Sequence, residues 1–198
     1  MSQEEQGIVS ALSTLCQELG VTCLVQVGAE DGFEADSIRE ATGCRAIAIE
    51  GLSNCKPYSD KLEYHYAIIG ATNCVMPFYD YGPGLSSQVP RKDIYALPYD
   101  IIQTRLDTFC NERGIVPDAL IIDTEGTTLD VLEGCGDLLD GIKIIYCEVQ
   151  SPQYALEREG SRPFGEVDTF LSSRGFAIRN GYPNYCAGPQ ANVTWIRK

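Results

Sequence analysis

The chain has 198 residues and a formal net charge of −13, from 28 acidic and 15 basic residues. This length fits one domain with a substantial core, and the composition is ordinary for a globular protein, with 44% hydrophobic and 22% charged residues. The negative balance and the lack of a lysine or arginine run argue against a nucleic-acid partner or an anionic membrane surface. The apolar runs are too short for a membrane span, and residues 1–6 do not resemble a secretory signal, so we expect a cytoplasmic protein.

The first third of the chain alternates helical and strand patterns. Apolar residues recur at helical spacing in the N-terminal region, residues 1–20, and as short continuous runs further on, with glycines between the segments. The predicted order is helix 4–19, strand 22–27, helix 33–42, strand 46–50, helix 56–62 and strand 64–69.

Residues 74–104 depart from this alternation. An aromatic, strand-like segment over 74–81 is followed by a glycine-proline turn and a polar connector. The chain is then extended again over 94–104, where Pro98 favours an edge position. We interpret residues 74–104 as a β-hairpin insertion, and its edge offers a place for a second copy to pair in a homodimer.

Alternation returns in the second half. The predicted order is helix 106–113, strand 119–123, helix 127–132, strand 142–149, helix 164–173, and a closing antiparallel pair over 176–179 and 193–196. Residues 1–198 therefore form a single α/β domain with a mostly parallel sheet.

The chemistry is expected where the strands end. In open α/β sheets ligands bind beyond the carboxyl ends of the strands. Glycines at 28 and 32 let the backbone approach a ligand, and Glu50 lies about twenty residues beyond this turn, where an acid accepts hydrogen bonds from ribose hydroxyls. The turn also contains Ala29, Glu30 and Asp31. Two acids there would repel a pyrophosphate but suit the cationic groups of S-adenosylmethionine.

The carboxyl ends of the other parallel strands should lie beside this turn, at the same rim, or edge, of the sheet. Predicted cofactor-binding residues are Gln26, Gly28, Ala29, Glu30, Asp31, Gly32, Glu50, Gly51, Ala67, Ile68, Ser87 and Asp123. Asp123 is the first choice for a catalytic carboxylate, followed by Glu125 and Glu148, although Asp123 could instead cap the next helix. His65 is an alternative base and more often a structural residue. Beyond these carboxylates there is no cluster of metal ligands, so no metal is predicted.

Several of these segments together resemble the FkbM-type methyltransferase family. They are the glycine turn from Val25 to Gly32, Ala48–Glu50, Arg105–Phe109, Ile122–Gly126 with Val131, Leu132 and Gly134, Tyr146–Val149 and Phe170–Phe176. The resemblance covers roughly residues 22–197. The chain departs from the family's pattern at Gln26, Ile121 and Thr128, where that pattern usually or often has Asp, Lys and Glu.

The resemblance implies a class I Rossmann-like fold with a seven-stranded sheet and S-adenosylmethionine as methyl donor. It also implies O-methylation of a hydroxyl on a sugar or other small molecule. Two alternatives stay open from the residues alone: a dinucleotide-dependent oxidoreductase, and a non-catalytic module that binds the cofactor.

Overall fold

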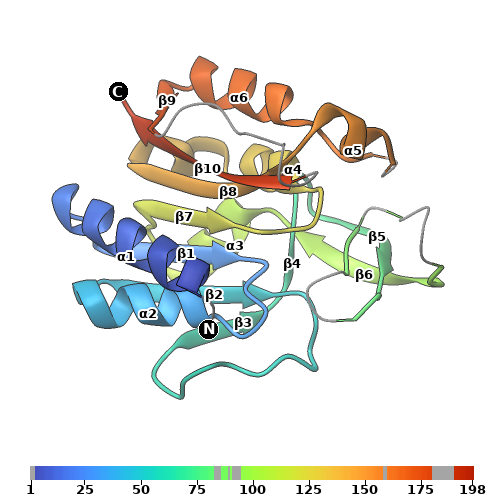
Figure 1. Ribbon diagram of the computed structural model, residues 1–198. Coiled ribbons are helices and arrows are strands. Elements are labelled where there is room, and N and C mark those ends of the chain that lie inside the picture. The colour runs from blue at the N-terminus through green and yellow to red at the C-terminus, as the bar shows by residue number, and fades with distance from the viewer. Residues whose placement is uncertain (1–2, 83–85, 89, 91–94, 158–159, 180–189) are drawn as a thin grey trace.

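A seven-stranded sheet forms the centre of the computed structural model, which describes residues 3–82, 86–88, 90, 95–157, 160–179 and 190–198. The strand order is β3-β2-β1-β7-β8-β10-β9 (Figure 1). The strands are β1 (Cys23–Val27), β2 (Arg45–Glu50), β3 (Glu63–Tyr66), β7 (Ala119–Ile122), β8 (Ile144–Gln150), β9 (Phe176–Ile178) and β10 (Gln190–Arg197). The pairs from β3 across to β8 are parallel, and β10 is antiparallel to both of its neighbours. The predicted α/β fold with a mostly parallel sheet is confirmed.

Helices cover both faces of this sheet, which explains why β1 and β7 are buried along their whole length (Figure 1). One face packs on α1 (Gln3–Glu18) and α2 (Phe33–Thr42). The other packs on α3 (Leu106–Arg113), α4 (Thr128–Glu133), the 3-10 helix η1 (Gly136–Gly141) and α6 (Phe164–Ser173). The short helix α5 (Pro152–Glu157) follows β8. Neither α5 nor η1 was predicted.

The order of the sheet reverses between β1 and β7. The chain runs outward from β1 through β2 to β3, then returns to the other side of β1 as β7. At this point the ends of the two strands are joined, because the Asp123 N–H donates to the Val27 carbonyl at 2.9 Å. A crevice at such a reversal is where an open α/β sheet binds its ligand.

The insertion and a short strand just before it in the chain form a second, three-stranded sheet beside the first (Figure 1). Its strands are β4 (Ile68–Ile69), β5 (Cys74–Tyr79) and β6 (Pro98–Thr104), in the order β4-β6-β5. The predicted antiparallel pairing within the insertion is present between β5 and β6. Parts of the predicted turn, connector and second strand, at 83–85, 89 and 94, lie outside the described residues.

Two predictions in this region are wrong. The strand expected over 64–69 breaks at Ala67, whose N–H donates to the Glu50 carbonyl at 2.9 Å, so that β3 stays in the main sheet and β4 joins the second. The helix expected over 56–62 is a loop. Here the Ser59 hydroxyl accepts from the Lys61 N–H at 3.1 Å, and the Tyr58 N–H donates to the Asp31 carbonyl at 2.8 Å. Both bonds use backbone N–H groups that a helix would need for its own hydrogen bonds.

Among the described residues no helix is long and apolar enough to cross a membrane. The eight described cysteines are free thiols, and all except Cys74 are buried. Burial raises the pKa of Cys16 to about 12 and that of Cys23 to about 11. Such thiols act as small hydrophobic core residues.

Candidate active site

The glycine turn after β1 brings the backbone against the end of β7. Gly28 has a φ of 72°, and a Cβ added there would lie 1.7 Å from the carbonyl oxygen of Asp123. The N–H groups of Gly28 and Ala29 both donate to the Ile49 carbonyl, at 3.0 and 3.1 Å. Only glycine fits this combination of conformation and close approach. The turn is therefore held between the ends of β2 and β7.

Glu50, at the end of β2, fixes the loops on either side of it. One carboxylate oxygen accepts from the Glu30 N–H and the other from the Leu52 N–H, each at 2.8 Å. Each oxygen keeps a second lone pair that can accept a hydrogen bond from a hydroxyl group. Burial, followed by the charges of Asp31 and Glu50, raises the pKa of Glu30. This corner of the site is thus acidic.

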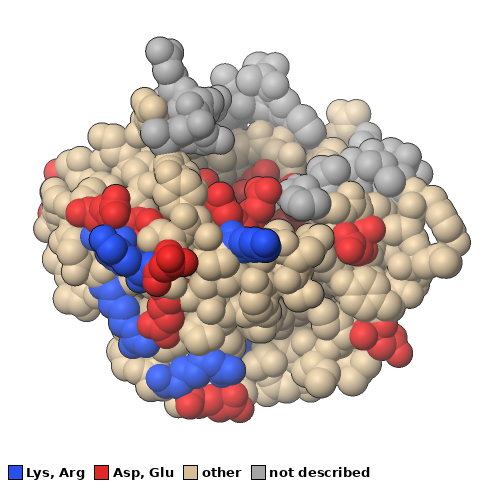
Figure 2. Space-filling model, turned by 90° about the horizontal axis from the view of Figure 1, so that it is seen from below, with Lys and Arg blue, Asp and Glu red and all other residues tan. Residues whose placement is uncertain are grey.

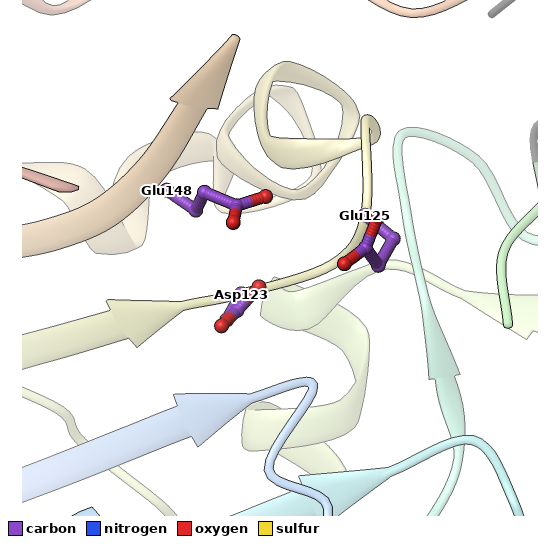
Figure 3. Close-up of side chains that lie close together, drawn as sticks. All are labelled: Asp123, Glu125 and Glu148. Atoms are coloured by element: carbon purple, nitrogen blue, oxygen red, sulfur yellow. The ribbon is translucent and has the colours of Figure 1, made fainter. Parts of the chain in front are cut away.

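Three carboxylates from separate segments meet at the rim (Figure 3). Asp123 follows β7, Glu125 lies in the turn before α4, and Glu148 comes from β8. One oxygen from each lies within 4.8 Å of the others. Glu148 also accepts from the Gln190 side-chain amide at 2.6 Å. The convergence predicted from the sequence topology is present in the fold.

The pKa of Asp123 is strongly raised. Burial of its carboxyl group, and next the charge of Glu125, raise the pKa of Asp123 from 3.8 to about 7, with further contributions from Glu34, Glu30 and Glu50. Part of the residue is open to solvent, which moderates the effect. A carboxyl group that titrates near neutral pH can exchange a proton during a reaction.

The same three oxygens are close enough to contact one divalent cation, although no metal was predicted from the sequence. Acidic groups at a surface are often this close without an ion. The arrangement permits a cation and does not by itself require one.

A cavity of about 700 Å³, counting its open mouth, lies over the reversal point of the sheet. The predicted residues that line it are Gly28, Glu30, Glu50, Gly51, Ala67, Ile68, Ser87, Asp123 and Glu125. Its charged residues, among those described, are all acidic. Acidic side chains also gather in a hollow of the face shown in Figure 2. Such a cavity favours a ligand with a positive charge.

Other predicted residues lie just outside the lining. They are Gln26, Ala29, Asp31, Gly32 and Glu148. Gln26 is buried and directed at α2, because its carbonyl accepts from the Ala35 N–H and its amide donates to Glu34, both at 3.0 Å. His65 is also outside, packed edge-on against Phe109 and bonded to Glu63 at 3.1 Å.

Sequence reasoning predicted Ile68 in the lining but did not predict its apolar neighbours Leu52 and Phe78 there. Leu52, Ile68 and Phe78 form a small buried cluster with Cys55, and Leu52, Ile68 and Phe78 face the cavity. Phe78 comes from β5, in the insertion. Its aromatic neighbours were visible in the sequence, but nothing in the spacing indicated which aromatic ring would turn inward.

The fold and this cavity define the class I methyltransferase architecture, and solved structures of that class superpose on the chain. The methyltransferase domain of a bacterial CtHen1 is 8% identical with a TM-score of 0.51, over 96% of this chain and 98% of that one. Cofactor-bound Rv0187 from MTB is 10% identical with a TM-score of 0.55, over 99% and 80%. An O-methyltransferase family protein from Burkholderia thailandensis gives the same identity and TM-score over 98% of this chain and 56% of that one. At these identities the likeness shows the fold alone.

The family follows from the sequence match. The model of the methyltransferase FkbM domain matches residues 26–178, and the chain belongs to this family. The resemblance seen in the glycine turn and the Asp123–Gly126 motif is confirmed. No curated protein matches the chain.

Proposed function

We propose that this protein is an S-adenosylmethionine-dependent methyltransferase that acts on a hydroxyl group of a sugar or another small metabolite. The observation that carries the proposal is the acidic cavity over the reversal point, between the glycine turn, Glu50 and Asp123. The cofactor has a sulfonium and an ammonium group, and both suit a cavity whose described charged residues are carboxylates.

The lining offers a partner for each part of this cofactor. Leu52, Ile68 and Phe78 supply an apolar wall for the adenine ring. Glu50 retains lone pairs for the ribose hydroxyls. Gly28 and Glu30 of the turn line the cavity, and the Glu30 carboxylate can accept from the ammonium of the amino-acid part. A dinucleotide fits less well, because Glu30 and Asp123 would face its pyrophosphate.

Asp123 is the proposed base. The cofactor, when bound, supplies an electrophilic methyl group. Its transfer to the acceptor oxygen would leave the electron pair of the broken carbon–sulfur bond on sulfur. The acceptor's hydroxyl proton passes to the Asp123 carboxylate, whose pKa of about 7 suits this transfer near neutral pH. Alignment of donor and acceptor contributes several kcal/mol more, on the order of 7 or above in favourable cases.

Titration calorimetry tests the cofactor assignment directly. We expect the protein to bind S-adenosylmethionine and S-adenosylhomocysteine, and NAD to give no heat of binding under the same conditions. If neither adenosyl compound binds at high micromolar concentration, or if NAD binds in their place, the proposal is wrong. Asp123→Ala should retain cofactor binding and lose methyl transfer when hydroxylated acceptors are screened with labelled cofactor. Transfer by this variant would remove Asp123 from the role of base.

A further inference from the structure

The insertion supplies one part of the cavity lining. Ser86, Ser87 and Gln88 line it. Ser87 pairs with Tyr79 through two backbone hydrogen bonds, of 2.9 and 3.1 Å, and the Gln88 side-chain amide donates to the Ile69 carbonyl at 3.0 Å. This short segment is therefore anchored to both β5 and β4.

A third anchor joins the segment to the carboxylate turn. The Ser87 hydroxyl donates to the backbone carbonyl of Glu125 at 2.8 Å, although the two residues are 38 positions apart. Ser87 is only 3% exposed, so water does not readily replace this bond. Ser87, a predicted cofactor-binding residue, lines the cavity, and its hydroxyl is bonded to the protein at Glu125.

The accepting residue has an unusual backbone. Glu125 has a φ of 43° and is followed by Gly126 with a φ of 97°. A left-handed conformation is unfavourable for a residue with a side chain and persists only where its surroundings hold it. The Glu125 side chain leaves this turn toward Asp123 and Glu148 (Figure 3). The conformation of the turn thus decides where the carboxylate lies.

We infer that Ser87 is a positioning residue, whose hydroxyl holds the Glu125 turn so that the Glu125 carboxylate strengthens binding of the sulfonium cofactor relative to the product, whose sulfur carries no charge. The inference rests on the proposed function. S-adenosylmethionine and S-adenosylhomocysteine differ by the methyl group and the positive charge on sulfur. A correctly placed carboxylate strengthens binding of the first and has little effect on the second.

The test compares the two ligands by titration calorimetry. The quantity measured is the affinity ratio, the dissociation constant of S-adenosylhomocysteine divided by that of S-adenosylmethionine. The wild-type ratio is the reference value for the variants. Ser87→Ala should lower the ratio about three- to ten-fold, as expected for loss of one hydrogen bond, and leave the affinity for S-adenosylhomocysteine nearly unchanged. Ser87→Thr keeps the hydroxyl and should restore the ratio.

A double-mutant cycle separates positioning from a general structural effect. Glu125→Gln should lower the ratio by itself, and adding Ser87→Ala to Glu125→Gln should have no further effect. Ser173→Ala is the matched control, because the Ser173 hydroxyl also donates to a backbone carbonyl, that of Phe170 at 2.7 Å, at an exposed position on α6. This control should keep the wild-type ratio.

The outcomes are distinct. A wild-type protein that binds neither ligand would overturn the proposed function and this inference with it. If both ligands bind, an unchanged ratio in Ser87→Ala or additive effects in the cycle would overturn the inference alone. If Ser87→Ala does not fold, Glu125→Gln and Ser87→Thr still decide: an unchanged ratio in the first or a lowered ratio in the second contradicts the inference.

Discussion

Asp123→Asn should make the protein more stable at alkaline pH while removing methyl transfer. Asparagine keeps the shape of the side chain but cannot ionise. In the folded protein, burial and the charge of Glu125 raise the pKa of Asp123 from 3.8 to about 7. Ionising this carboxyl group is therefore harder in the folded chain than in the unfolded chain, and the asparagine variant escapes that penalty.

The size of the effect follows from linkage. Between about pH 4 and pH 7 the folded protein holds a proton on Asp123 that the unfolded chain has released, so wild-type stability falls as pH rises through this window. A shift of about three units corresponds to about 4 kcal/mol at most. Because Asp123 is partly open to solvent, we reduce this to about 2 kcal/mol. For a chain of this length that is about 4 to 8 °C in the unfolding temperature.

Thermal unfolding of the ligand-free proteins at several pH values between 4 and 8.5 measures this. The variant's advantage over wild type should grow across the series and level off above pH 7. Asp140→Asn, at an exposed position in η1, is the control and should show no such trend. A pH-independent difference, or an Asp123→Asn variant less stable than wild type at pH 8, would refute the reasoning.

Three further predictions concern the framework around the site. Gly28→Ala should abolish cofactor binding and lower the unfolding temperature, because its Cβ would lie 1.7 Å from the Asp123 carbonyl oxygen. Gly43→Ala is its control, because Gly43 has a φ of 76° but nothing within 4 Å of the added Cβ. It should lower the free energy of unfolding by only about 1 to 2 kcal/mol and keep cofactor binding. Trp195→Phe should lose about 1 to 3 kcal/mol in urea unfolding because the indole N–H donates to Asp168 at 3.0 Å from a fully buried position. Asp118→Asn should destabilise the protein at pH 7, because the Asp118 carboxylate accepts from the Thr22 and Cys23 N–H groups. These bonds help hold the pKa of Asp118 below 3.8. The difference in unfolding free energy between wild type and variant should therefore fade in unfolding curves below about pH 4.

The main sheet could be predicted because short local sequence patterns encode its strands. Apolar runs such as Ala119–Ile122 read as buried parallel strands, and acids directly after strands must meet at one edge. That reasoning located Glu50, Asp123 and Glu148 without any knowledge of contacts. It succeeded because strand ends in one parallel sheet are placed by topology rather than by individual side chains.

The insertion could not be predicted to the same depth because its structure depends on contacts between distant residues. The break at Ala67 depends on a bond to the Glu50 carbonyl, and the place of Ser87 depends on Tyr79 and Glu125. Gln26 shows the same limit inside the main sheet. At its position on β1 the Gln26 side chain could point toward a ligand or toward a helix. Its hydrogen bonds to Glu34 and Ala35 of α2 direct it toward the helix.

The acidity of the cavity connects stability with binding. Backbone contacts hold Glu30, Glu50, Asp123 and Glu125 near one another, so their mutual repulsion is part of the folded state. A cation that enters relieves this repulsion, whereas a neutral ligand of the same shape does not. Methyl transfer removes the sulfonium charge from the cofactor, and part of the repulsion then returns. The same carboxylates that attract the methyl donor should therefore weaken the hold on the product and favour its release.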